Sequence, residues 1–291
     1  MKGIVLAAGK GTRMYPMTLP VCKPLLPVYD KPLIYYPIAV LMQAGIRDIL
    51  LIVPPDEMYA FVKLLGDGSD LGLRISYRIQ KVQRGIADAF LLGEQFAGGE
   101  EVCLILGDNI FCGGGFAGCF REAAQEAASG GAVVFGYPVD DPRPFGVVEM
   151  GADGRAISIE EKPQHPKSNL IVPGLYFYGS DVCALARELK PSARGELEIT
   201  DLNRIYLEQG RLRVVRLPEE ITWMDAGNAQ SLLRAADMVM RHQTQSGCQI
   251  ACLEEAAWRM GFISYAQMRE LGGAMRQTAY GQYILSLKEE A

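Results

Sequence analysis

The chain has 291 residues, of which 49% are hydrophobic, and a formal net charge of −5 at pH 7. This length allows one large α/β domain or two small ones, and the acidic balance argues against a general binder of nucleic acids or acidic membranes. No stretch has the pattern of a signal peptide or the length of a membrane span, and the seven cysteines lack a C-x-x-C motif. We therefore expect a cytoplasmic protein with reduced thiols.

Apolar runs predict strands near residues 2–7, 48–53, 73–79, 102–107, 132–137, 145–150, 156–161, 171–178 and 211–216. Helical patterns fall at residues 31–44, 56–65, 86–96, 116–128, 181–189, 198–209 and 228–242. This alternation predicts an α/β fold with a mostly parallel, Rossmann-like central sheet covered by helices on both faces. The strands of residues 145–178 have no helices between them, so we expect mixed or antiparallel pairing there.

From about residue 248 onward the pattern changes to short helices, at Glu254–Met260, Ser264–Glu270 and Gly281–Lys288. We therefore divide the chain into an α/β unit of residues 1–247 and a helical tail of residues 248–291. Packing of the tail on its own sheet is the simplest expectation for these helices.

The apolar run Ile4–Leu6 leads directly into a loop of small residues that ends in Arg13. Small residues let backbone N–H groups approach an anion, and a guanidinium fits phosphate oxygens. The loop is neither a P-loop nor a dinucleotide fingerprint, because Gly11 follows Lys10 and Met14 stands in place of a third glycine. A phosphate-binding loop at the carboxyl end of the first strand and a simple β-turn both remain open.

Lys23 follows this loop in a segment that Pro24 and Pro27 stiffen. A cation held in a stiff segment near a phosphate loop could neutralise charge on a transferring phosphoryl group. The alternative is a solvated surface lysine.

Two carboxylates follow apolar stretches: Asp108 comes after Val102–Leu106, and Asp225 comes after Trp223-Met224. Carboxylates at the carboxyl ends of strands can hold Mg²⁺ against nucleotide phosphates, because a hard cation prefers oxygen ligands. Separately, each could instead start a turn or cap a helix. Together they favour a shared site for a divalent cation.

The middle of the chain holds a further charged group, Glu160-Glu161-Lys162, at the end of an alternating run. One glutamate and Lys162 could face a pocket, although an ordinary charged strand end fits the pattern as well. Strands near Gly146 and Gly174 begin with glycine, which can admit a sugar ring against the backbone or mark a bulge.

Several of these segments, taken together and in this order, resemble the nucleotidyltransferases that activate sugar 1-phosphates, and most closely the short bacterial glucose-1-phosphate thymidylyltransferase family. The resemblance is carried by Gly9–Arg13, Leu25–Pro32, Ile34–Pro37, Leu106–Phe111, Phe145–Glu149, Glu160–Pro163, Gly195–Asp201, Cys252–Arg259 and Tyr280–Tyr283. It implies transfer of a nucleotidyl group from dTTP to glucose 1-phosphate, with dTDP-glucose and pyrophosphate as products and Mg²⁺ as cofactor.

The resemblance also implies roles for individual residues. The nucleotide would be bound by Leu6, Ala8, Gly9, Gly11, Thr12, Arg13, Lys23, Gln80 and Gly85. The sugar phosphate would be bound by Asp108, Asn109, Gly146, Glu161, Lys162 and Val172. The catalytic set would be Arg13, Lys23, Asp108, Lys162 and Asp225, with Asp108 and Asp225 holding the metal.

A phosphate monoester is already a nucleophile at neutral pH, so direct in-line displacement needs positioning and charge neutralisation rather than a general base. The chain has only two histidines, His165 and His242, which fits that expectation.

The sequence departs from the family pattern at Pro24, Arg84 and Asp88, where the family usually has Gln, Asp and Gln. These changes fall in the nucleotide-binding segments, so use of UTP in place of dTTP remains open. Two other classes also remain: a non-catalytic sensor of sugar nucleotides, which could have lost the metal carboxylates, and a nicotinamide-dependent oxidoreductase, which the missing third glycine disfavours.

The resemblance finally implies a homo-oligomer, a tetramer, with contacts from the helix around Tyr35-Tyr36 and from the tail. In the family the tail also helps to build a regulatory site for a nucleotide sugar, and Glu255 and Arg259 match residues of that site.

Overall fold

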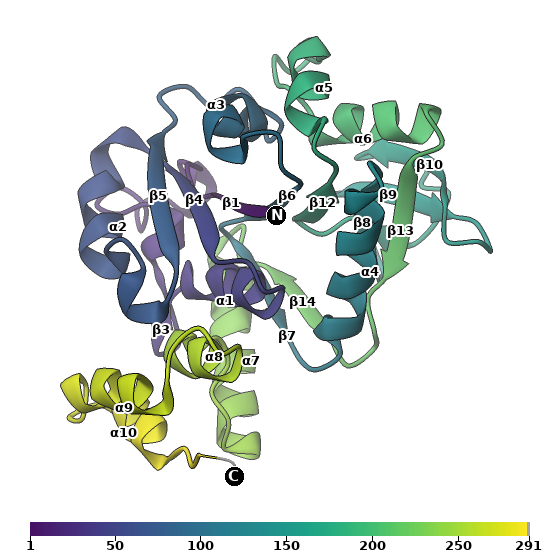
Figure 1. The fold of residues 1–291 in the computed structure, drawn as a ribbon. Coiled ribbons are helices and arrows are strands. Elements are labelled where there is room, and N and C mark those ends of the chain that lie inside the picture. The colour runs from purple at the N-terminus through teal and green to yellow at the C-terminus, as the bar shows by residue number, and fades with distance from the viewer. Residues whose placement is uncertain (290–291) are drawn as a thin grey trace.

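The computed structural model describes residues 1–289, and its centre is a ten-stranded sheet with helices on both faces (Figure 1). Its strands are β1 (Lys2–Leu6), β4 (Asp48–Val53), β5 (Arg74–Ile79), β6 (Val102–Leu106), β8 (Ala132–Pro138), β9 (Gly146–Met150), β10 (Ala156–Glu161), β11 (Leu170–Ile171), β12 (Leu175–Tyr178) and β13 (Leu212–Arg216). Two ribbons lie outside it: β2 (Pro27–Val28) with β3 (Lys31–Pro32), and β7 (Asn109–Cys112) with β14 (Thr222–Asp225).

The helices of the α/β unit are α1 (Tyr35–Gln43), α2 (Met58–Leu65), α3 (Asp88–Ala97), α4 (Phe116–Ala128), α5 (Val182–Glu188), α6 (Ile199–Glu208) and α7 (Ala229–Ser246). The tail adds α8 (Leu253–Arg259), α9 (Tyr265–Ala274) and α10 (Ala279–Ser286), which lie together below the sheet in Figure 1.

The sheet has a parallel half and a mixed half. Strands β5, β4, β1 and β6 run parallel in that order, as expected for apolar strands joined by helices. Strand β12 runs antiparallel to both β6 and β8, whereas β13 runs parallel to β8, and β9, β10 and β11 pair antiparallel. The expected α/β fold with mixed pairing in the middle of the chain is thus confirmed.

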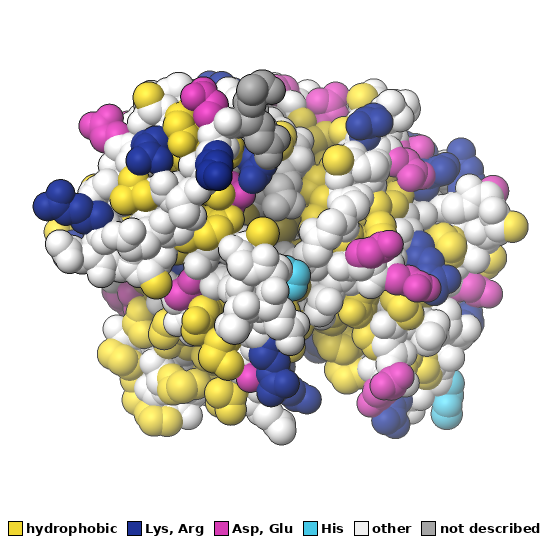
Figure 2. Space-filling view, turned by 90° about the horizontal axis from the view of Figure 1, so that it is seen from below, with side chains coloured by type: hydrophobic (Ala, Val, Ile, Leu, Met, Phe, Trp, Pro, Cys, Tyr) yellow, Lys and Arg dark blue, Asp and Glu magenta, His cyan; other side chains and the backbone are white. Residues whose placement is uncertain are grey.

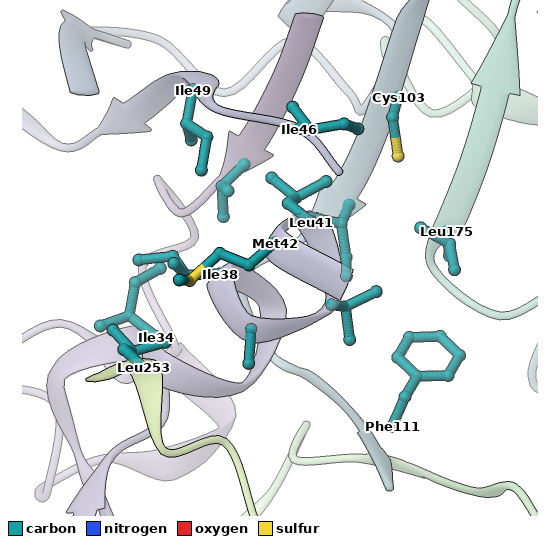
Figure 3. Close-up of a cluster of buried hydrophobic side chains, with 14 of the residues drawn as sticks. Ile34, Ile38, Leu41, Met42, Ile46, Ile49, Cys103, Phe111, Leu175 and Leu253 are labelled. Atoms are coloured by element: carbon teal, nitrogen blue, oxygen red, sulfur yellow. The ribbon is translucent and has the colours of Figure 1, made fainter. Parts of the chain in front are cut away.

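The core has a large apolar cluster on each face of the sheet. One contains residues of α1, α2 and α4, and the other contains residues of α3, α5 and α6. The tail belongs to the first cluster, and Figure 3 shows Leu253 of α8 beside Ile34, at the start of α1. Because its side chains are buried in this cluster, the tail is an integral part of the core. Such burial stabilises the fold by about 25 cal/mol per Å² of apolar surface removed from water.

Two expected elements differ in the structure, and one observed ribbon was not expected. The helix expected from residue 31 begins at Tyr35, because Lys31 precedes a proline, which disfavours helical backbone, and pairs in a short ribbon instead. The expected strand 171–178 is two strands, because Pro173-Gly174 interrupts the ladder between β11 and β12. The ribbon of β7 and β14 was not expected, because its strands are short and far apart in the sequence.

The expected oligomer contact at Tyr35-Tyr36 is wrong for Tyr36. Its side chain is 1% exposed, and its hydroxyl donates to the Val28 carbonyl at 2.9 Å within the same chain. Most of α1 is buried likewise, against the sheet and α8, so this helix is core rather than an exposed surface.

On the face shown in Figure 2, basic and acidic side chains are interspersed, and hydrophobic side chains gather toward the lower left. Within residues 1–289, no helix has the length and apolar character needed to cross a bilayer. All seven cysteines lie in this range and are free thiols.

Asp48 joins three strands of the parallel half. Its carboxylate accepts from Lys2 Nζ of β1 at 3.2 Å and from Arg74 Nη2 of β5 at 2.7 Å. The hydrogen bond from Arg74, together with Lys2, lowers the pKa of Asp48 to about 2. A lowered pKa stabilises the fold above the unfolded value near pH 4, and this contribution is lost as the pH falls through 2.

We therefore expect Asp48→Asn to lower the free energy of unfolding by up to about 1 kcal/mol at pH 7. The difference from the wild type should vanish near pH 2, as measured by denaturant unfolding at both pH values. Asp141→Asn is the control, because exposed Asp141 forms its ion pair with Arg143, two residues away. An equal loss at both pH values in Asp48→Asn would contradict the assignment.

Candidate active site

A cavity of about 490 Å³ opens at the carboxyl ends of β1 and β6. These strands pair in parallel with Leu6 opposite Leu106, so the segments that follow them emerge at the same edge. The sequence-predicted site residues that line the cavity are Leu6, Gly9, Gly11, Thr12, Arg13, Lys23, Gln80, Gly85, Asp108, Asn109, Gly146, Glu161, Lys162, Val172 and Asp225. Ala8 does not line it: Ala8 is buried, and its carbonyl accepts from Gln83 Nε2 at 2.6 Å.

The loop after β1 is shaped by its glycines. Gly11 has a φ of 63°, and its carbonyl accepts from the Thr18 hydroxyl at 2.7 Å, which closes the loop. A Cβ at Gly9 would meet nothing within 4 Å, so this backbone borders open space. The short 3₁₀ turn Thr12–Met14 follows, with Arg13 on the cavity wall. The loop thus presents backbone and a guanidinium to one space, as an anion site requires.

The ribbon of β7 and β14 brings the two aspartates together. Its register places Asp225 opposite Asn109, and the Ala226 N–H donates to the Asp108 carbonyl at 3.0 Å. Lys23, which is 7% exposed, donates from Nζ to Asp108 Oδ2. Asn109 Nδ2 donates to Asp108 Oδ1 at 3.0 Å, so both oxygens of this carboxylate have partners.

Asp225 has an unfavourable electrostatic environment. Burial, and then the charge of Asp108, raise the pKa of Asp225 to about 6, although Lys23 and Arg13 act in the opposite direction. Two partly buried carboxylates with too little compensating charge form a site that a hard divalent cation would stabilise. Within the described residues there is no cluster of three or more His, Cys, Asp or Glu side chains for a metal, so this pair is the candidate.

A second group of residues comes from β9, β10 and the loop after β11. Val172 N–H donates to the Gly146 carbonyl at 2.8 Å, and a Cβ at Gly146 would lie 3.4 Å from Glu161 Oε2. Glu161 Oε2 also accepts from the Thr200 hydroxyl at 2.6 Å. Lys162 has a φ of 46°, a conformation that is unfavourable for a side chain with a Cβ. Such strain is typical of functional sites, and here it accompanies a lysine on the cavity wall.

Gln80 and Gly85 form another part of the wall, directly after β5. Gly85 has a φ of 103°, and a Cβ there would lie 2.4 Å from the Leu197 carbonyl oxygen, so only glycine fits. The Leu197 N–H donates to the Arg84 carbonyl at 2.6 Å, and Ala87 N–H donates to the Leu197 carbonyl at 3.1 Å. These bonds fix the loop of Gly85 against the segment before α6.

The cavity residues that were missed in the sequence include Arg194, Trp223 and Asn203. Arg194 lies 2.8 Å from Glu198 and 3.5 Å from Glu161, and Trp223 Nε1 donates to Asn109 Oδ1 at 2.6 Å. Asn203 has the one buried side-chain N or O atom, its Nδ2, without a partner in the described chain. Arg194 could have been found in the sequence, because it directly precedes Gly195-Glu196, which carries part of the family resemblance. Trp223 stands in an apolar stretch and Asn203 in a helical pattern, so nothing in the sequence marked either as a site residue.

Comparisons with known proteins show what this chain is similar to. The family model described as nucleotidyl transferase matches residues 2–242. A glucose-1-phosphate thymidylyltransferase of Neisseria meningitidis is 54% identical over 99% of both chains, and one of Mycobacterium tuberculosis is 50% identical over 99% of both chains. A solved Bacillus anthracis structure, attributed to the same enzyme and in complex with a sucrose, has a TM-score of 0.75 and 43% identity over 82% of this chain and 94% of that chain. A UDP-glucose pyrophosphorylase complexed with UDP-glucose has a TM-score of 0.70 and 25% identity over 83% of this chain and 98% of that chain.

The opposite environments of the two aspartates give opposite expected effects on stability. In metal-free buffer at pH 7, Asp225→Asn should stabilise the protein by about 1 kcal/mol, because it removes an ionised carboxylate that burial and Asp108 disfavour. Asp108→Asn should destabilise it by about 3 kcal/mol, because Lys23 then loses its charged partner while buried. Thermal unfolding with a chelator measures both, and destabilisation of similar size in the two variants would contradict this account.

Proposed function

The chain belongs to the nucleotidyl transferase family, and on that premise we propose that it is a glucose-1-phosphate thymidylyltransferase. It would transfer the nucleotidyl group of dTTP to glucose 1-phosphate and release pyrophosphate. The observation that carries the proposal is the convergence of Arg13, Lys23, Lys162 and the aspartate pair on one cavity, between the walls of Gln80 and Glu161. Identity of 50–54% to curated thymidylyltransferases over nearly the full chain supports it.

The chemistry needs two polyanions brought together. The sugar phosphate supplies its own nucleophilic oxygen, so the protein has to position it and neutralise charge. We assign Lys162 to the phosphate of the sugar and Glu161 to its hydroxyls, because the two side chains are adjacent and Glu161 accepts hydrogen bonds. Arg13 and Lys23 take the triphosphate side, at the loop after β1.

Mg²⁺ fits the aspartate pair, because Asp225 is buried beside a second carboxylate with too little compensating charge. Asp108 and Asp225 would hold it, and the remaining ligands would be phosphate oxygens and water. When bound, it would neutralise developing charge on the phosphates. Lys23 holds Asp108 in place whether or not the metal ion is bound.

UTP remains an alternative nucleotide, because Pro24 lines the cavity beside Lys23, and Arg84 and Asp88 surround Gln80. A non-catalytic sensor of sugar nucleotides is disfavoured by the retained pair of aspartates and by the cations around it.

We also propose a division into a catalytic unit of residues 1–247 and a tail of residues 248–291, supported by the family match that ends at residue 242. A tetramer with tail contacts, and a regulatory site near Glu255 and Arg259, belong to the same proposal. Glu255 already accepts from the Tyr283 hydroxyl at 2.6 Å and from Arg259 Nε at 2.7 Å. The seven free thiols support a reducing, cytoplasmic location.

A nucleotide panel tests the reaction. The protein is incubated with glucose 1-phosphate, Mg²⁺ and each of dTTP, UTP, CTP, ATP and GTP, and released pyrophosphate is measured. We expect most turnover with dTTP, and a loss of at least about a hundredfold in Asp108→Asn. Release from none of the five nucleotides would reject the proposal.

Lys162→Met tests the assignment of the sugar-phosphate wall. Removing this charge should raise the KM for glucose 1-phosphate by about tenfold or more, and should leave the KM for dTTP within about twofold. Lys167→Met is the control, because Lys167 pairs with Glu160 and does not line the cavity. A defect confined to dTTP would contradict the assignment.

A further inference from the structure

Asp88 is a buried carboxylate beneath the wall of the cavity. It is the first residue of α3 and is 1% exposed. Within the described chain its hydrogen-bond donors are side chains: Oδ2 accepts from Gln80 Nε2 at 2.9 Å, and Oδ1 accepts from Arg84 Nη2 at 2.7 Å. Neither bond caps α3, although a carboxylate in the first turn of a helix commonly does so. The carboxylate is instead used to hold Gln80 and Arg84.

The chemistry of Asp88 fixes which way the Gln80 amide points. An ionised carboxylate only accepts hydrogen bonds, so the amide atom that faces it is the NH₂ group. Gln80 Oε1 then lies on the other side of the amide, and Gln80 lines the cavity. No donor in residues 1–289 reaches Oε1, and this atom is not one of the buried atoms without a partner, so it is open to the cavity.

The same cavity wall also offers a donor, in the loop that follows Gln80. Gly85 also lines the cavity, and its N–H has no acceptor within the described residues. A wall with both an acceptor and a donor matches a ring N–H flanked by a carbonyl, which is the edge of thymine and uracil. Cytosine presents a bare ring nitrogen and an amino group on that edge, so it would place acceptor against acceptor and donor against donor.

We propose that Asp88 is a positioning residue that sets base specificity, by holding the Gln80 amide with its oxygen toward the cavity. The site then admits thymine and uracil and rejects cytosine. This inference rests on the proposed function and on the expectation, implied by the family resemblance, that Gln80 and Gly85 bind the nucleotide. The departures at Arg84 and Asp88 thereby act together: Arg84 secures the carboxylate, and the carboxylate orients Gln80.

The substitution Asp88→Asn tests this directly, because Arg84 can only donate. Arg84 would take the oxygen of the new amide, and its NH₂ group would then face Gln80. The Gln80 amide would have to turn, with its NH₂ toward the cavity, which removes the clash with the ring nitrogen of cytosine and creates one with the ring N–H of uracil. Arg84→Gln is the matched control: it disturbs the same cluster but leaves the carboxylate that holds Gln80.

UTP and CTP are the substrates to compare, because they differ only on the base edge in question. With glucose 1-phosphate and Mg²⁺, we expect the wild type to favour UTP over CTP in kcat/KM by at least about a hundredfold. The ratio should fall at least about tenfold in Asp88→Asn and stay within about twofold in Arg84→Gln. A smaller fall, or an equal fall in both variants, would overturn the inference, since a purely structural role would affect both alike.

Thermal unfolding checks that each variant is folded, and Asp88→Ala, which leaves the Gln80 amide free to present either end, replaces Asp88→Asn if the latter is not, with the same tenfold criterion. Turnover by the wild-type protein distinguishes failure of the proposed function from failure of the proposed role of Asp88. No pyrophosphate from dTTP or UTP would reject the proposed function. Turnover of CTP as fast as UTP by an active wild type would overturn only the role of Asp88.

Discussion

Asp108 and Asp225 carry like charge in one buried space, and the arrangement around them follows from that repulsion. Lys23 is buried against Asp108, although a buried lysine is costly without such a partner. Arg13 reaches the same space from the loop after β1. The pair is created by the register of β7 against β14, a ribbon that stands outside the main sheet. A two-residue shift of that register would separate the aspartates, and Lys23 and Arg13 would then no longer face a concentrated negative charge.

The rest of the site is held together at two glycines, where segments of the chain approach each other closely. A Cβ at Gly174 would lie 2.6 Å from the Leu106 side chain, and the Gly174 N–H donates to Asn109 Oδ1 at 3.0 Å. Asn109 thus links Asp108, its neighbour in the chain, to Gly174 at the junction between β11 and β12. Gly85 has the same function at the other end, against Leu197. Both glycines join segments far apart in the sequence, so the two ends of the cavity are set by contacts between distant parts of the chain.

Local patterns in the sequence were enough to predict the sheet, the loop that ends in Arg13, and the strand-end position of Asp108. Those features depend on neighbours in the chain, such as an apolar run followed by small residues. The pairing of β7 with β14 and the contacts of Arg194 depend on distant segments, which no local pattern reveals. Burial of Tyr36 was missed for the same reason, since it packs in a cluster with Val28, Ile110 and Leu232, which are far from it in the sequence or lie outside its helix. Asp88 was recognised only as a departure, because its partners become visible in three dimensions.

The tail shares the core cluster of α1, with Leu253 against Ile34 (Figure 3). On the ribosome, α1 is made early and α8 late, so the part of the apolar surface of α1 that α8 covers stays exposed while most of the chain is being translated. At synthesis rates of about 5–20 residues per second, that interval lasts about ten seconds or more. A nascent chain therefore exposes an aggregation-prone apolar surface on α1 during its synthesis. A chaperone that covers α1 in that interval would protect the chain from aggregation.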